Sequence, residues 1–118
     1  MPSPLLPDGH PTAVLDELPP HRCSCGITRR AFVAESGGAM SVHLLRVQQA
    51  TTHYHRVATE VYVILDGTGE VELDGVRHEA KPMSAFLIRP GTRHRAIGDL
   101  TALVVCLPAA DDTDEYVD

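Results

Sequence analysis

Short runs of β-branched and aliphatic residues, divided by glycine, proline and polar residues, dominate this sequence from residue 27 onward. Such runs are typical of strands. We count eight to ten of them, no convincing helix and no internal repeat. The pattern predicts a single all-β domain, a sandwich or a barrel. The clearest runs are 27–35, 41–49, 60–65, 69–73, 76–80, 84–90, 93–99 and 101–107.

Two turns connect these runs with distinctive residues. Asp74-Gly75 is a two-residue turn of the type I′ class, in which both central residues have positive φ, and it predicts a β-hairpin. Centring the hairpin there places Glu72 opposite Arg77, a favourable cross-strand pair. The second turn is Ser36-Gly37-Gly38, where the two glycines supply the backbone freedom that a turn needs.

The two ends of the chain differ from its middle. Six prolines within residues 1–22 exclude a long helix and favour an extended arm. We therefore divide the chain into an N-terminal arm (1–26), a barrel (27–110) and an acidic tail (111–118). The tail holds five acids and no base, whereas the rest of the chain has 11 acids and 10 bases. The net charge of −6 thus comes mainly from the tail, and the tail's composition predicts disorder.

Composition argues against several classes of protein. No apolar run reaches the roughly 18 residues that a membrane span needs, and the first residues lack the pattern of a secretory signal. The arginines are scattered and aromatic residues make up only 4%, so no nucleic-acid surface is expected. We expect a soluble cytoplasmic protein. Three cysteines are an odd number, which argues against a disulfide framework, and Cys23 and Cys25 are too close in sequence for an ordinary strain-free bridge. We therefore expect reduced thiols at these two positions.

Three histidines and one glutamate form the candidate metal site. His53 and His55 are separated by one residue, which places them on the same face of an extended strand. Glu60 opens the next apolar run, and His94 follows the turn Pro90-Gly91. If these strands are neighbours, three imidazoles and one carboxylate meet inside a barrel. They form a ligand set for one divalent transition metal: Fe, Mn, Ni, Zn or Cu.

These residues resemble the motifs of the cupin superfamily, specifically the small single-domain cupins, over roughly residues 40–107. His53, His55, Glu60 and Gly67 match the first motif, with one, four and six residues between them, and Gly91 and His94 match the second. The resemblance implies a jelly-roll β-barrel (a double-stranded β-helix) that pairs as a homodimer. The departures from the motifs are at turn and packing positions: Val47, Met83, Arg89 and Gly98.

Further residues are candidates for the surroundings of the metal. Tyr62 shares the face of Glu60 by alternation, so it is a candidate catalytic acid or hydrogen-bond donor, although core packing explains it equally well. Arg46, Arg89 and Cys106 are candidate substrate-binding residues, and Arg89 could hold an anion at the mouth of the barrel. We expect the remaining histidines, His10, His21, His43 and His78, to lie outside the site.

The ligand set favours a metal-dependent enzyme that acts on a small oxygenated or anionic molecule. An open site can activate dioxygen or polarise a carbonyl or enolate oxygen. A dioxygenase-like oxidoreductase is the first interpretation, and an isomerase or lyase is the second. The alternative is a non-catalytic module that binds or senses a small molecule. A structural domain with vestigial ligands is the third interpretation, and it predicts no bound metal.

Overall fold

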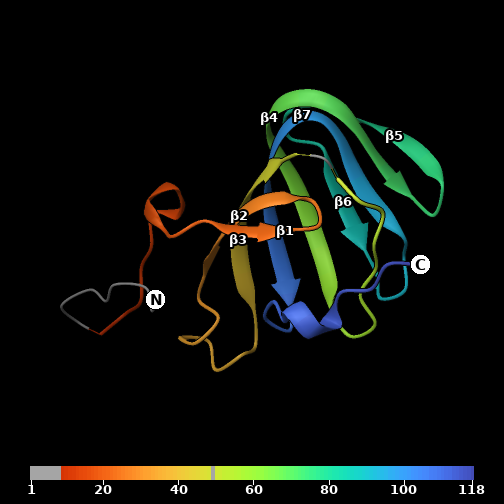
Figure 1. The fold of residues 1–118 in the computed structure, drawn as a ribbon. Coiled ribbons are helices and arrows are strands. Elements are labelled where there is room, and N and C mark those ends of the chain that lie inside the picture. The colour runs from red at the N-terminus through yellow and green to blue at the C-terminus, as the bar shows by residue number, and fades with distance from the viewer. Residues whose placement is uncertain (1–8, 49) are drawn as a thin grey trace.

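The computed structural model describes residues 9–48 and 50–118, and within them seven strands form one antiparallel sheet that curves into a barrel (Figure 1). The predicted all-β jelly-roll barrel is confirmed. Two 3₁₀ helices of three residues accompany the strands. The elements are η1 (Leu15–Glu17), β1 (His21–Cys23), β2 (Gly26–Ala31), β3 (Ser41–Val47), β4 (Thr59–Leu73), β5 (Val76–Ala80), β6 (Ala85–Ile88), β7 (His94–Leu107) and η2 (Asp112–Asp114).

Strands pair in the order β1-β2-β3-β7-β4-β5, and β6 pairs with β4. The β4–β7 pair forms the long spine of the barrel, and its register runs from Thr59 opposite Leu107 to Leu73 opposite His94. Each of these two strands unites two runs that the sequence had suggested were separate. The prediction of eight to ten short strands was therefore too high by at least one.

Glycines allow β4 and β7 to arch together, as Figure 1 shows. A Cβ atom on Gly67 would lie 1.9 Å from the carbonyl oxygen of Asp99, and one on Gly69 would lie 2.1 Å from that of Ile97. Gly67 also has φ of +86°, in the region that favours glycine. Because neither glycine carries a Cβ atom, the backbones of β4 and β7 can approach closely in the bend. The strand β4 therefore continues through both glycines.

The predicted hairpin is confirmed. Asp74 and Gly75 have φ of 47° and 82°, as a type I′ turn requires, and Glu72 lies opposite Arg77. The Arg77 Nε atom lies 3.3 Å from Glu72 Oε2. The predicted turn at 36–38 is also present, with positive φ at both glycines.

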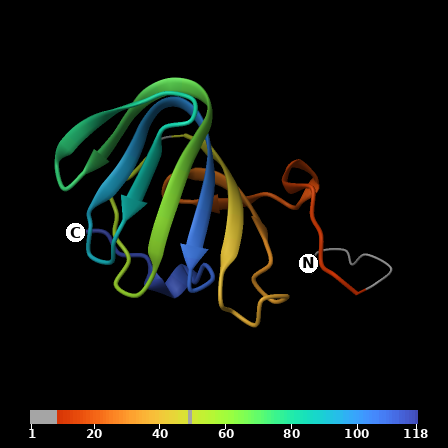
Figure 2. The same cartoon turned by 180° about the vertical axis from the view of Figure 1, so that it is seen from behind.

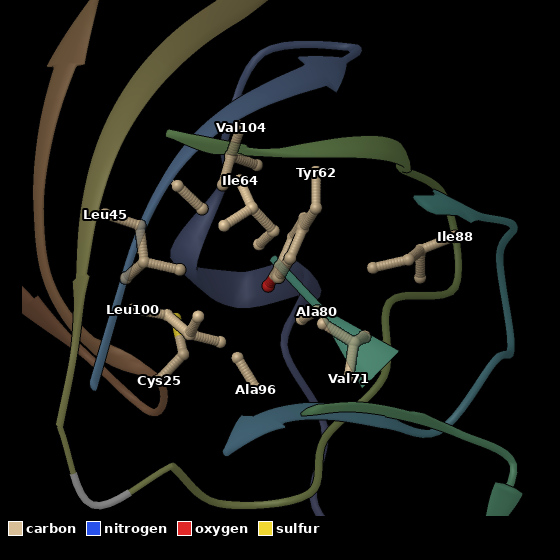
Figure 3. Close-up of a cluster of buried hydrophobic side chains, with 11 residues drawn as sticks. Cys25, Leu45, Tyr62, Ile64, Val71, Ala80, Ile88, Ala96, Leu100 and Val104 are labelled. Atoms are coloured by element: carbon tan, nitrogen blue, oxygen red, sulfur yellow. The ribbon is translucent and has the colours of Figure 1, made fainter. Parts of the chain in front are cut away.

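Aliphatic side chains from opposite walls of the barrel fill its interior (Figure 3). Leu45, Ile64 and Val71 have no exposed surface, and Leu100 has only 1%. The chain has few aromatic residues, and Tyr62 is the aromatic side chain in this core. Burial of the aliphatic groups is the main source of stability, at roughly 25 cal/mol for each Å² of apolar surface removed from water.

Both chain ends depart from the predicted division. β1 and the start of β2 belong to the sheet, so the barrel begins before residue 27. The 3₁₀ helix η1 lies near β2 and β3, and Leu18 after it is buried (Figures 1 and 2). Residues 1–8 lie outside the described part of the chain. The acidic tail was expected to be disordered, but it is ordered: it contains η2, and Tyr116 forms a β-bridge with Tyr54. Among the described residues, no helix is long and apolar enough to span a membrane.

Candidate metal centre

The backbone joins the two histidine-bearing segments directly. His53 and His94 form a β-bridge, with N–H···O distances of 3.1 and 2.9 Å in the two directions. The N–H of Gly91 donates to the carbonyl oxygen of His55 at 2.7 Å. Gly91 has φ of +84°, which explains why glycine occupies this turn. The turn before β7 therefore positions His94 against the His53 segment.

Hydrogen bonds fix the orientation of all three imidazole rings. A carbonyl oxygen can only accept a hydrogen bond, so a ring nitrogen beside one must be the N–H donor. In each ring that nitrogen is Nδ1, which leaves the Nε2 lone pair free to bind a metal. The Nδ1 atoms of His53, His55 and His94 donate to the carbonyls of Thr51, Asp114 and Thr92 at 2.8, 2.7 and 2.9 Å.

The potential ligand atoms converge in a buried space. One ring nitrogen from each histidine lies within 4.8 Å of those from the other two. Glu60 Oε1 lies 3.0 Å from His55 Nε2 and 3.3 Å from His94 Nε2. Within the described residues, these last three atoms are buried and have no hydrogen-bond partner of acceptable geometry. Buried polar atoms without partners are rare, and one cation at their centre would satisfy all of them.

The electrostatics of the site fit a bound cation. Burial would raise the pKa of the Glu60 carboxyl, but His55 and His94 outweigh it and hold that pKa far below its usual range. Burial would likewise lower the pKa of His55, yet the contact with Glu60 raises it to about 9. Burial, together with the nearby His94, lowers the pKa of His53. Without metal, a proton on His55 supplies the positive charge, so metal and proton compete for this position.

Two residues of the acidic tail complete the site, and the sequence analysis missed both. Asp114 is buried, and its carboxylate accepts hydrogen bonds from the backbone N–H groups of residues 56–58. These residues lie between His55 and Glu60 in the sequence. Glu115 Oε1 lies 3.8 Å from His53 Nε2 and accepts a hydrogen bond from Ser24 Oγ at 3.0 Å. Two features of the sequence could have indicated an ordered tail. They are the aromatic Tyr116 and the helix-capping pair Asp111 and Thr113.

The pocket beside these atoms encloses a cavity of about 40 Å³. Tyr62 lines the pocket, with its ring edge-on to His94 at 6.0 Å between centroids. Burial raises the pKa of Tyr62 well above its usual value, so the phenol stays protonated. Cys106 also lines it, and burial raises the pKa of its thiol to about 12. Both residues face the pocket, and their roles toward a substrate stay predictions.

A family model for the cupin domain matches residues 41–107, more than half of the chain. This protein belongs to the cupin family. A crystal structure of a protein from Planctomyces limnophilus is 35% identical, has a TM-score of 0.83, and the match covers 89% of this chain and 94% of that one. No curated protein matches this sequence.

Two enzymes with lower identity share the fold of this cupin. Streptomyces Pac13, described as a unique nucleoside dehydratase, is 15% identical with a TM-score of 0.76, and the match covers 89% of this chain and 88% of Pac13. Ectoine synthase from P. lautus is 17% identical with a TM-score of 0.71, covering 89% and 87%. At these identities the likeness concerns the fold alone.

Two predicted substrate-binding arginines of this cupin lie away from the pocket. Arg46 follows the buried Leu45 in β3, so alternation turns it outward, where it donates to Thr101 Oγ1 at 2.6 Å. Arg89 follows the buried Ile88 at the end of β6 and is exposed. Neither side chain lines the pocket, so the structure gives no support to these two predictions.

His43 and Arg30 do line the pocket, although His43 was expected to lie elsewhere and Arg30 was not considered. His43 is buried, and its Nε2 lies 2.7 Å from Ser41 Oγ. Burial lowers the pKa of His43 to about 4, so the ring is neutral at pH 7. Arg30 forms an ion pair with Asp112 of the tail at 3.1 Å. Alternation along β3 could have identified His43, since it shares a face with Leu45.

Proposed function

We propose that this cupin is a metal-dependent enzyme and that His53, His55, Glu60 and His94 hold one divalent transition metal. The convergence of buried, unpartnered Nε2 and Oε1 atoms carries this proposal. The set contains no thiolate, which is unlike closed structural zinc sites rich in cysteine. Imidazole and carboxylate ligands suit Fe(II), Mn(II), Ni(II), Zn(II) and Cu(II).

A metal held by these four side chains would supply Lewis acidity or, with a redox-active metal, reactivity toward dioxygen. The chain's own groups act around it. Glu115 lies beside His53 and could accept a proton from a substrate hydroxyl. Tyr62 presents a protonated phenol that could donate a hydrogen bond to a substrate oxygen. The neutral ring of His43 lines the same pocket.

The lining of the pocket favours a small oxygenated substrate over an anion. Four acidic residues of the tail line the pocket, and the positive charge of Arg30 is already paired with Asp112. With Arg46 and Arg89 outside the pocket, Arg30 is the one arginine or lysine among the described residues that line it. A cavity of about 40 Å³ admits only a few non-hydrogen atoms beside the metal, so a small molecule, or one end of a larger one, would enter.

A dioxygenase-like oxidation remains the first proposal for the reaction, and isomerisation or elimination is the second. Glu115 favours the second, because these reactions need a base that moves a proton, and its carboxylate lies beside the proposed metal ligand His53. In both reactions the metal ligands are the same. The two proposals differ in their need for dioxygen.

Oxygen consumption tests the proposal. The chelated protein is loaded with Fe(II), Mn(II) or Zn(II) and supplied with small carboxylic acids, thiols and sugars, with and without oxygen. Stoichiometric oxygen uptake with Fe(II) supports the oxidation, whereas oxygen-independent turnover with several metals supports the second reaction. Glu115→Gln should lower kcat more than it raises KM. Ligand binding without turnover under every metal would contradict an enzymatic role and favour a sensing or binding module.

A further inference from the structure

The two cysteines at the tip of the β1–β2 hairpin face the metal pocket together. Cys23 lies opposite Gly26, so Ser24 and Cys25 form the turn. The Sγ atoms of Cys23 and Cys25 are 2.8 Å apart, and both residues line the same pocket as His53 and His55. The two thiols are therefore in direct contact. The function proposed above gives this contact no role.

The two thiols differ in exposure and acidity. Cys25 is buried, whereas Cys23 is partly exposed and within reach of small molecules. The hydrogen bond from Cys25 lowers the pKa of Cys23 to about 7, despite the opposing effect of burial. The same hydrogen bond, with burial, raises the pKa of Cys25. Accessible thiolates of this acidity are the ones that react with oxidants, and a second thiol in contact can resolve the product.

We propose that Cys23 and Cys25 form a redox-active dithiol that a hydroperoxide oxidises to an intramolecular disulfide at the edge of the metal pocket. The Cys23 thiolate attacks the terminal peroxide oxygen, the O–O bond breaks, and the other oxygen leaves as an alcohol or water after protonation. Cys23 is then a sulfenic acid. The Cys25 sulfur attacks the Cys23 sulfur, the S–O bond breaks, and water leaves with the Cys25 proton. The two thiols together lose two hydrogens and two electrons.

Hydrogen bonds connect this dithiol to the metal site. Ser24, which stands between the two cysteines, donates through its hydroxyl to Glu115. Its carbonyl accepts the N–H of Thr51 at 2.8 Å, and the carbonyl of Thr51 in turn accepts Nδ1–H of His53. A disulfide across Ser24 would move these groups. This coupling rests on the proposed metal site, whereas the oxidation itself does not.

Hydrogen peroxide applied to the reduced, chelated full-length protein tests the oxidation. Two of the three cysteines should stop reacting with a thiol reagent, and the mass of the intact protein should fall by two hydrogens. A reductant should reverse both changes. Peptide mapping should join Cys23 to Cys25. Cys23→Ser and Cys25→Ser should each abolish the disulfide, while the matched control Cys106→Ser should still form it. Retention of all thiols, or a sulfinic acid at Cys23 without a disulfide, would overturn the proposal.

Zn(II) titration of the reduced and oxidised proteins tests the coupling. We expect oxidation to weaken binding by about tenfold or more, as changes beside metal ligands commonly do. Peroxide should leave the affinity of the Cys23→Ser/Cys25→Ser variant unchanged. Equal affinity in both redox states of the wild type would overturn the coupling. Absence of Zn(II) binding in both states would instead contradict the proposed metal site and leave the thiol result standing.

Discussion

At the scale of single residues, Glu60 controls the charge of the pocket. Its carboxylate is 7% exposed and lies between the Nε2 atoms of His55 and His94. Without metal it retains a proton on His55, whose pKa rises from 6.5 to about 9. With metal, the same negative charge would offset the ion. The two states therefore respond differently to pH.

Stability should fall with rising pH in the chelated protein. A raised pKa in the folded state stabilises it fully below the unfolded value, near 6.5, and this contribution disappears as pH passes about 9. The loss from this group is at most about 3 kcal/mol. Glu60→Gln should flatten this part of the pH dependence. Urea unfolding at several pH values measures it, and identical slopes for the variant and the wild type would contradict the assignment.

Asp114 is the residue of the tail whose removal should lower the stability of the protein most. Asp114→Ala removes the acceptor of three backbone N–H groups at residues 56–58, so unfolding free energy should fall by about 2–4 kcal/mol. Metal affinity should fall as well, because residues 56–58 connect His55 to Glu60. Asp118→Ala is the matched control, since that carboxylate is exposed and pairs with Arg93. Equal effects of both variants on denaturant midpoints would refute this role.

At the scale of elements, β4 and β7 hold the barrel closed through their shared arch. Gly67 lies where the two backbones come nearest, and it has positive φ. Gly37 has a similar φ of +67° but lies in an open turn, with nothing near the position of a Cβ atom. The two glycines therefore share backbone strain and differ in crowding.

Alanine at these two positions should separate the two effects. Gly37→Ala should destabilise the protein by about 1–2 kcal/mol, the penalty of a left-handed conformation. Gly67→Ala should cost roughly 1–3 kcal/mol more, because its Cβ would collide with the carbonyl of Asp99. Thermal or urea unfolding gives both values. A Gly67→Ala variant as stable as Gly37→Ala would show that the strands can separate without loss.

At the scale of the whole molecule, the sequence predicted the features that depend on local residue spacing. It did not predict the features that depend on contacts between residues far apart in the chain. His53, His55, Glu60 and His94 were selected because alternation and turn residues act over a few positions. The positions of Glu115 and of the tail depend on contacts with Tyr54 and residues 56–58, which are far from the tail in the sequence. The acidic composition gave no sign of it. Gly67 and Gly69 were also interpreted as the end of one strand and the start of the next, whereas both lie within β4.

The arm provides a prediction about assembly. The described chain before η1 projects beyond β1 (Figure 2), and Val14 there is 60% exposed. We propose that the arm joins two copies into a homodimer. Light scattering should give twice the mass of one chain for the full-length protein and the monomer mass after deletion of residues 1–20. A monomeric full-length protein, or a dimer that survives the deletion, would contradict this role of the arm.

The central claim is that three imidazoles and one carboxylate bind a single divalent metal, and a Co(II) titration followed by visible absorption tests it most directly. The account predicts saturation at one equivalent, weak ligand-field bands of a nitrogen and oxygen environment, no thiolate charge-transfer band, and loss of the signal in His94→Ala. Absence of saturable binding, or an intense thiolate band that persists in His94→Ala, would contradict it.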